Sequence, residues 1–287
     1  MDKVMAHLGS PRRLGNCGVL MHLCLEAVNK AGLEVELIRL HDLDIKNCRG
    51  CLSCVYKGKC AIADDDMPML LEKLVNASGV VIAAPTYIFS PSAVIKTLID
   101  RSLTLTPYLE GLKDKKRYAV NISIAGNAKW NPMGTAFLSQ LAMSYGFKVV
   151  DQLEAYSPGP AETALQDETV ARAVKMGEAL ASAVRGEYKL PAPEMSGLKC
   201  PVCMSNVFNF KKENRVQCAV CLAEGVLVQS SDRFEVAFNN TGHNFFSIEH
   251  KIDHVKDWVV PSRDRFLEAR ERIKARLNEL GIKKYGV

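Results

Sequence analysis

The sequence predicts an α/β protein in which a doubly wound parallel sheet precedes a small antiparallel module and a C-terminal helix. Strand-like apolar runs alternate with helical patterns over residues 1–188, two Cys-x2-Cys pairs follow, and a charged amphipathic stretch lies last. The chain has 287 residues, 48% hydrophobic and 24% charged, which is the composition of a folded globular protein. This length allows one large domain and a smaller one.

The elements of the first domain follow one another regularly. Strands are expected at 3–9, 33–40, 79–85, 117–126 and 148–156, and helices at 15–31, 68–76, 91–100, 135–145 and 168–185. No breaker interrupts the strands. Five short apolar strands separated by helices describe a five-stranded sheet of flavodoxin type.

Composition changes after residue 188. The stretch LPAPEMSGLK has two prolines and little periodicity, so we place a boundary there and assign 189–260 to a second domain. Short alternating runs in this domain predict antiparallel strands. Residues 261–287 are expected to form a basic amphipathic helix, whose apolar stripe should pack on another surface. The stripe comprises Phe266, Ile273, Leu277 and Leu280.

Charge and hydropathy exclude several classes of function. Most of the net charge of +5 lies in residues 261–287, where a solvated helix face accounts for it, so we expect no sequence-specific nucleic-acid binding. No apolar run is long enough to span a membrane, and no secretory signal is visible. Eight of the ten cysteines fall in two tight clusters, which favours metal ligation in a reducing compartment. We therefore expect a cytoplasmic protein without membrane contact.

Two loops after expected strands have the residues of a ligand site. The first, GSPRRLGNCG, combines glycines with the neutral donors Ser10 and Asn16 at a helix start, where a phosphate is stabilised; a tight turn is the alternative. The loop lacks the Gly-Lys-Ser/Thr of a Walker motif. The second, APTYIFSPSAVIKTLIDR, places apolar side chains directly after a buried strand, where a flat ring could lie.

Together these loops resemble those of the flavodoxin-fold NAD(P)H-dependent FMN reductase family, in order and in spacing. The resemblance implies that FMN is bound, with its phosphate at the first loop, its ring at the second and a third contact from IAGNAKWNPMG. The implied residues are Ser10, Arg12, Asn16, Cys17, Pro85, Thr86, Tyr87, Ile88, Phe89, Ala125, Gly126 and Asn127. Cys17 replaces the family's Ser or Thr and offers mainly its backbone N–H. Trp130 either shields the flavin or packs.

The first cysteine cluster is NCRGCLSCVYKGKC, which contains Cys48, Cys51, Cys54 and Cys60. Its C-x2-C-x2-C-x5-C spacing resembles the bacterial ferredoxin run, although x5 replaces x3 and Ala61 replaces the usual proline. It also resembles the iron-sulfur flavoprotein branch of the FMN family, which implies a [4Fe-4S] cluster near FMN and a homodimer or homotetramer. Free thiols are the alternative. We expect this loop at the same end of the sheet as the flavin.

The second cluster comprises Cys200, Cys203, Cys218 and Cys221. Two Cys-x2-Cys knuckles bracket an expected hairpin, which is typical of a zinc ribbon; a rubredoxin-like iron site is the alternative. Because so small a module has little core, the metal is expected to act mainly as a structural staple. A docking surface for a redox partner or, together with the basic tail, for nucleic acid is the functional alternative.

These features predict an FMN-dependent oxidoreductase that passes electrons from NAD(P)H or ferredoxin, through FMN and a [4Fe-4S] cluster, to a small-molecule or protein acceptor. A cluster-free quinone or aromatic-compound reductase and a redox-sensing binding protein are the alternatives. No nucleophile triad or paired carboxylates accompany the loops, so no general acid or base is assigned. The cofactor would supply the chemistry, and the protein would position it.

Overall fold

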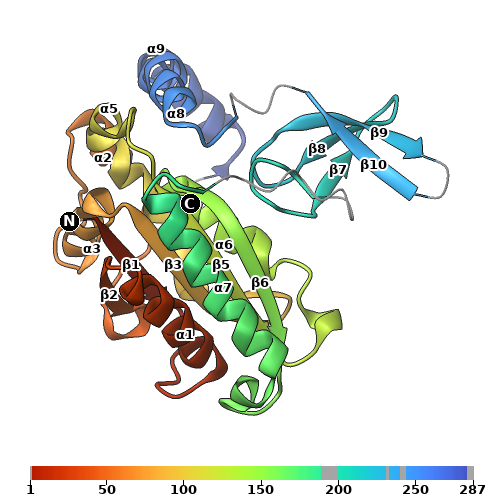
Figure 1. The fold of residues 1–287 in the computed structure, drawn as a ribbon. Coiled ribbons are helices and arrows are strands. Elements are labelled where there is room, and N and C mark those ends of the chain that lie inside the picture. Colours follow the sequence, from red (N-terminus) through yellow and green to blue (C-terminus); the bar gives the residue numbers. More distant parts are fainter. Residues whose placement is uncertain (1, 189–198, 231–232, 240–243, 283–287) are drawn as a thin grey trace.

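A computed structural model describes residues 2–188, 199–230, 233–239 and 244–282. The first part of the chain forms a parallel sheet of strand order β2-β1-β3-β5-β6 (Figure 1). Its strands are β1 (Lys3–Leu8), β2 (Glu34–Arg39), β3 (Gly79–Tyr87), β5 (Tyr118–Ala125) and β6 (Lys148–Tyr156). The first six residues of β3 are all buried, as expected for a strand covered on both faces. The predicted flavodoxin-like order is confirmed.

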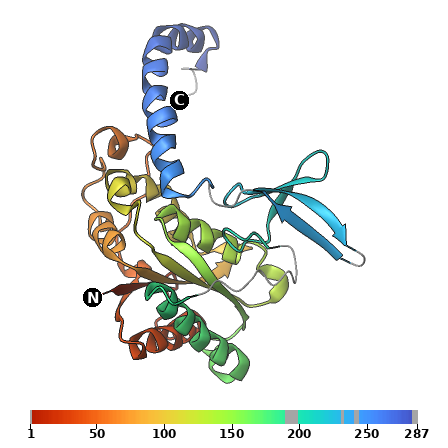
Figure 2. The same ribbon diagram turned by 45° about the horizontal axis from the view of Figure 1, so that its top comes forward.

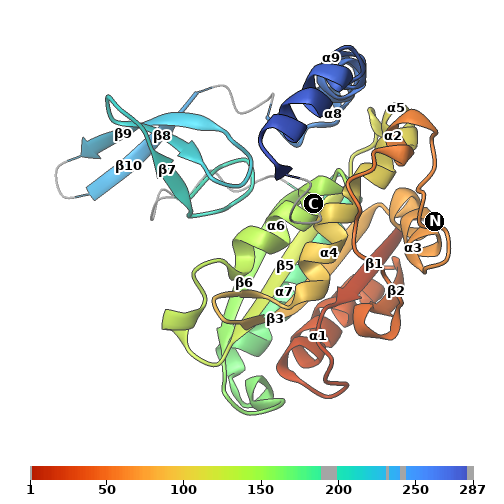
Figure 3. The ribbon, with the colours of Figure 1, turned by 180° about the vertical axis from the view of Figure 1, so that it is seen from behind.

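Helices cover both faces of this sheet. On one face α1 (Asn16–Lys30) packs beside α7 (Asp167–Val184), and their apolar residues share a core with Val4 and Ala6 of β1. The other face carries α3 (Met67–Asn76), α4 (Ala93–Arg101) and α6 (Gly134–Ser144), which share a second core with Met5 (Figure 3). Successive side chains of β1 therefore point to opposite faces of the sheet and pack in two separate cores.

The observed bounds lie within a few residues of those expected, but several short elements were not predicted. They are η1 (Leu40–Asp42), α2 (Ser53–Tyr56), β4 (Ser90–Pro91), η2 (Ser102–Tyr108), α5 (Leu109–Leu112), η3 (Ala128–Trp130) and η4 (Glu162–Leu165). Such short segments depend on tertiary contacts more than on hydrophobic periodicity. β4 is antiparallel to the end of β3 and makes a hairpin there.

A small antiparallel sheet of order β10-β9-β8-β7 follows, and it was predicted. Its strands are β7 (Phe208–Phe210), β8 (Arg215–Cys218), β9 (Glu224–Ser230) and β10 (Arg233–Phe238). The module lies against α6 and β6: its four cysteines belong to the same buried cluster as Leu138 and Leu141 of α6. Gln152 Nε2 of β6 also donates a hydrogen bond to Cys203 O at 3.5 Å.

The chain then forms α8 (Ile248–His254), the π-helical turn η5 (Val255–Val259) and α9 (Val260–Glu279). Lys251 of α8 donates hydrogen bonds to Met143 O (2.5 Å) and Ser144 O (3.0 Å), at the C-terminal end of α6. An ammonium at this end interacts favourably with the helix dipole. Burial nevertheless lowers the pKa of Lys251 to about 7.

The deep blue α9 extends away from the rest of the molecule (Figure 2). Its predicted apolar stripe does not pack within the described chain, because Phe266, Ile273, Leu277 and Leu280 are each 39% to 54% exposed. Packing of this stripe on another surface therefore stays a prediction. Among the described residues, no helix combines the length and the apolar character that crossing a bilayer requires. The cytoplasmic location stays a prediction.

The domain boundaries also stay predictions. Residues 189–198, where we placed the first boundary, lie outside the described residues, as do residues 283–287 at the end of the expected C-terminal helix. His250 and His254 lie four residues apart on α8 and therefore share one face of the helix. They are half-buried, with stacked rings whose centroids are 6.1 Å apart.

Candidate functional site

The loop between β1 and α1 has the form of an anion site. Ser10 is buried and its Oγ accepts a hydrogen bond from Arg12 N at 3.3 Å, while the Arg12 side chain remains exposed. α1 begins at Asn16, so the free N–H groups of its first turn face this loop. These N–H groups, the helix dipole and the guanidinium together favour a phosphate.

Two predicted phosphate residues have side chains that are used elsewhere. Asn16 Oδ1 accepts hydrogen bonds from Thr163 N (3.0 Å) and Thr163 Oγ1 (3.1 Å), and its Nδ2 donates to Gly159 O (2.8 Å). This side chain therefore ties the first loop to the loop after β6. The Cys17 thiol is buried in the core, and burial raises its pKa to about 12. A phosphate contact from either residue would come from its backbone N–H.

The hairpin that joins β3 to β4 forms the candidate ring site. Its two-residue turn holds Ile88 at φ 47° and Phe89 at φ 68°. Two-residue hairpins of this kind favour Asn-Gly, and placing a β-branched residue in the left-handed region costs about 1–2 kcal/mol. Tyr87, Ile88 and Phe89 are 49%, 88% and 52% exposed. Strained backbone presenting apolar side chains is a feature of ligand-binding loops.

A buried polar network links this hairpin to the loop after β5. Thr86 Oγ1 donates to Asn131 Oδ1 at 2.6 Å, and Ser123 Oγ donates to the same oxygen at 3.0 Å. Gly134 makes room for the network, because a Cβ there would lie 2.1 Å from both Asn131 Oδ1 and Ser123 Oγ. Asn131 is 5% exposed, and its Nδ2 has no hydrogen-bond partner among the described residues. Sequence reasoning missed Asn131; its place in the third loop was the available signal.

The other predicted residues of the third loop are arranged differently. Ala125 is buried at the end of β5, whereas Gly126 and Asn127 are exposed. Asn127 Oδ1 caps the following turn by accepting a hydrogen bond from Lys129 N at 2.9 Å. The Trp130 side chain is 61% exposed. It therefore does not pack in the protein interior, which was one of the two roles expected for it.

Beside the hairpin lies an open cavity of about 410 Å³. It is lined by Tyr87, the β4 residues, the start of α4 and Phe137 of α6. A cavity of this size, lined largely by apolar groups, suits a small organic molecule.

Replacement of Asn131 by alanine is expected to weaken FMN binding 10-fold to 50-fold. The change removes the shared acceptor of Thr86 and Ser123, leaves their hydroxyls only the longer 3.3 Å hydrogen bond to each other, and loosens the hairpin from the third loop. Fluorescence titration of the apoprotein with FMN measures the effect. Asn76→Ala, at an exposed position on α3, is the matched control. An affinity within twofold of the unaltered chain would show that the network does not support the flavin site.

The first cysteine set, Cys48, Cys51, Cys54 and Cys60, lines one small cavity together with Arg101. The loop is shaped by left-handed residues at Gly50, Leu52 and Gly58. Two backbone N–H groups donate to its sulfurs: Gly50 N to Cys48 Sγ and Ile62 N to Cys60 Sγ, each at 3.4 Å. Burial, followed by the charges of neighbouring cysteines, raises the pKa of the Cys54 thiol.

The structure corrects the predicted position of this set. The cysteine loop leaves β2 at the end of the sheet that carries the ring hairpin but runs back, so that its cavity adjoins Asp100 and Arg101 at the C-terminal end of α4. α2 consequently lies beside α5, away from the ring hairpin (Figures 1 and 3). From Ala93, next to the hairpin, to Arg101 the helix rises about 12 Å. The direction of a loop after a strand was not readable from the sequence.

The sulfurs of the first set are less tightly grouped than those of the second. In the part of the chain that the structure describes, only the second set has its sulfurs within 4.8 Å of one another. A cubane holds its thiolates further apart than a tetrahedral ion does. Arg101 Nη2 donates to Cys60 Sγ at 3.6 Å, and its buried Nε has no hydrogen-bond partner in the parts of the chain that the structure describes. A buried cation with a free N–H beside four thiols fits an anionic iron-sulfur cluster.

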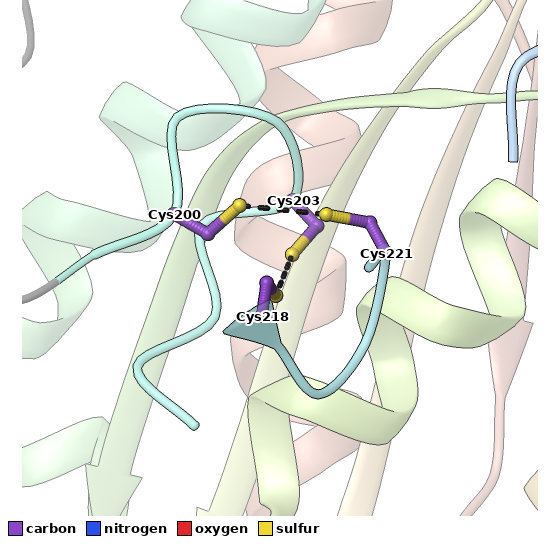
Figure 4. Close-up of side chains that lie close together, drawn as sticks. All are labelled: Cys200, Cys203, Cys218 and Cys221. Atoms are coloured by element: carbon purple, nitrogen blue, oxygen red, sulfur yellow. Dashed lines mark hydrogen bonds between the residues drawn. The ribbon is translucent and has the colours of Figure 1, made fainter. Parts of the chain in front are cut away.

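The second cysteine set, Cys200, Cys203, Cys218 and Cys221, lies on two matching turns (Figure 4). In the first turn Cys200 N donates to Ser205 O, and Met204 N donates to Cys200 O, each at 2.8 Å. The second turn has the same two hydrogen bonds: Cys218 N donates to Ala223 O at 2.8 Å, and Leu222 N donates to Cys218 O at 3.1 Å. Met204 and Leu222 both have left-handed backbone, at φ 60° and 62°. This repetition is the local geometry that makes each turn a metal knuckle.

The second set fits a tetrahedral ion. Its sulfurs are buried, and the pairs Cys200–Cys221 and Cys203–Cys218 are each 3.4 Å apart. Zn–S bonds of about 2.3 Å place tetrahedral sulfurs about 3.8 Å apart, so a small adjustment would accommodate the ion. Hydrogen bonds among the four thiols hold the pKa of Cys218 below its usual range and raise the pKa of Cys203 and Cys221. A bound metal would favour the thiolate form of all four.

Comparisons with known proteins agree with this geometry. The family model "NADPH-dependent FMN reductase" matches residues 3–133. An iron-sulfur flavoprotein of Archaeoglobus fulgidus is 28% identical over 188 residues, covering 66% of this chain and 83% of that protein. A flavone synthase of Aspergillus candidus is 26% identical over 246 residues, covering 75% of each. Further iron-sulfur flavoproteins match over shorter stretches, and the chain spans between 48% and 65% of their lengths.

Among solved structures, a flavone reductase has the same fold over nearly the whole chain. The TM-score is 0.74 at 22% identity, covering 98% of this chain and 97% of that one. The fold and site thus define a flavin-dependent oxidoreductase. Residues 3–133 match an NADPH-dependent FMN reductase domain, several relatives of the chain are named iron-sulfur flavoproteins, and the second cysteine set fits an added C-terminal module.

Proposed function

We propose that this protein is an iron-sulfur flavoprotein that takes electrons from NAD(P)H or ferredoxin and passes them through FMN and a [4Fe-4S] cluster to an acceptor. The observation that carries the proposal is the cavity lined by all four thiols of the first cysteine set and by a buried guanidinium, whose Nε has no hydrogen-bond partner within the described residues. FMN would supply the change between two-electron and one-electron transfer.

The chain's own residues would hold each group in place. The first-turn N–H groups of α1, with Ser10 and Arg12, would bind the phosphate, and the hairpin of Pro85 to Phe89 would contact the ring. Ala125, Gly126 and Asn127 would supply the third contact. The second cysteine set would hold zinc as a structural staple. We propose a homodimer or homotetramer, since α9 exposes an apolar stripe.

Anaerobic reduction with NADPH tests the proposal. Both the visible absorbance of the flavin and the electron paramagnetic resonance of a reduced cluster are expected to respond, and reduced ferredoxin serves as the alternative donor. Reduction of the flavin by either donor while the iron centre stays oxidised under all conditions would contradict electron passage between them.

A second candidate is a reductase of an unsaturated aromatic compound in which the first cysteine set plays no part. The flavone synthase that shares 75% of its length with this chain, and the cavity of about 410 Å³ beside the ring hairpin, favour it. Turnover of a flavone by the Cys54→Ser variant at the unaltered rate would support this candidate over the first.

A further inference from the structure

A buried ion pair closes the loop that carries the first cysteine set. Arg101 Nη1 and Asp65 Oδ2 are 2.5 Å apart, and both side chains are fully shielded from solvent. The pair also binds the backbone of Lys46: Arg101 Nη1 donates a hydrogen bond to Lys46 O (2.6 Å), and Lys46 N donates one to Asp65 Oδ2 (3.1 Å). Residues 46 and 65 bracket the cysteine loop, so the pair fastens its two ends together.

Closing a loop with a buried ion pair has a large desolvation cost. Removing two charges from water costs several kcal/mol per ion, and well-packed apolar residues often stabilise as much. The remaining donors of Arg101 point to a further role. Nη2 donates to Cys60 Sγ at 3.6 Å, and Nε is buried without a hydrogen-bond partner among the described residues. Arg101 also lines the cavity formed by the four cysteines.

We propose that Arg101 is a positioning residue that raises the reduction potential of the [4Fe-4S] cluster, with Asp65 opposing it. This inference rests on the proposed function, which places the cluster in that cavity. One-electron reduction adds one negative charge to the cluster and breaks no bond. A fixed cation and N–H groups directed at the sulfurs stabilise that added charge, whereas the Asp65 carboxylate destabilises it.

Three variants separate this role from loop closure. Arg101→Gln removes the cation, Arg101→Lys keeps it without the guanidinium fork, and Asp65→Asn removes the opposing charge at nearly constant shape. Arg172→Gln is the matched control, because it breaks the Arg172–Asp151 pair between α7 and β6, outside the cysteine cavity. Iron and sulfide are measured first, and the midpoint potential is then found by anaerobic titration monitored by electron paramagnetic resonance.

The expected shifts have opposite signs. Arg101→Gln should lower the equilibrium constant for cluster reduction at least tenfold, a fall of about 59 mV for one electron, and Arg101→Lys should lie between it and the unaltered chain. Asp65→Asn should raise the potential, and Arg172→Gln should leave it unchanged. A variant that merely loosened the loop would not reverse the sign between Arg101→Gln and Asp65→Asn.

The outcomes distinguish failure of the proposed function from failure of the role proposed for Arg101. An unaltered chain that binds no iron overturns the proposed function, and the inference with it, before any variant is compared. Full iron content with equal potentials in all variants overturns only the role of Arg101. If Arg101→Gln binds no iron, Asp65→Asn decides alone: a raised potential supports the proposal, and an unchanged or lowered one refutes it.

Discussion

We expect Cys54→Ser to abolish iron binding while FMN and the C-terminal metal stay in place. Cys54 lies between the other members of the first cysteine set in sequence and lines their common cavity. A cubane needs four thiolates, and a hydroxyl is a poor substitute for one. Iron and sulfide should fall from about four per chain to nearly none, as measured by metal analysis and visible absorbance after anaerobic purification.

Two controls make this result specific. Cys24→Ala alters a buried cysteine of α1 outside both sets, and it should leave iron unchanged. FMN content should also be unchanged in Cys54→Ser, because the cysteine cavity lies at the far end of α4 from the ring hairpin. Unchanged iron in the Cys54→Ser variant would sink the cluster hypothesis and leave the loop as a set of free thiols.

The second large effect is expected for Cys218→Ser, which should remove the C-terminal metal and unfold the antiparallel module. Structural zinc supplies much of the folding free energy of small modules, about 10–16 kcal/mol in isolated peptides. Here the four sulfurs are also part of the buried cluster that includes Leu138 and Leu141 of α6. The variant should therefore lose several kcal/mol of stability as well as zinc.

Hydrogen exchange measured along the chain checks this prediction. Strands β7 to β10 should lose protection, while β1, β3 and β5 keep it. Cys54→Ser is the reciprocal control, because it should keep zinc and lose iron. A Cys218→Ser variant that retained both its metal and full protection in β8 would show that the second cysteine set is no metal site.

The fold was predictable because its signals are local. Each parallel strand is an apolar run bounded by helical patterns, and the order of loops placed Ser10 and Tyr87 after β1 and at the end of β3 as expected. The knuckles were equally readable, since Cys-x2-Cys spacing alone places two sulfurs on one turn. The structure groups all four sulfurs of the second cysteine set as that spacing implies.

The remaining features of the site depend on contacts between distant segments. The side-chain amide of Asn16 is hydrogen-bonded to residues about 140 positions later in the chain. Nothing in the sequence therefore indicated that this amide faces away from the phosphate loop. Asn131 and Thr86 meet only because β3 and β5 are neighbours in the sheet. Likewise, Arg101 reads as an ordinary residue of an amphipathic helix until folding places it against Asp65 and Cys60.

The left-handed turn of the ring hairpin shows a different limit. Ile88 and Phe89 have the lowest preference for positive φ, so local propensity argues against the turn that forms. Pairing of β4 with β3 imposes it. Conformations that contradict the local preference of the residues occur most often at functional sites. The turn at Ile88 and Phe89 is such a case, and it lies at the predicted flavin contact.

Electron transfer through FMN and a cluster is tested most directly by the content of iron, acid-labile sulfide, zinc and FMN per chain after anaerobic purification. We expect about four irons, four sulfides, one zinc and bound FMN, divided between the two cysteine sets and the flavin loops. Zinc and FMN without iron would contradict electron transfer through a cluster, and would leave a flavin reductase whose first cysteine set has another role.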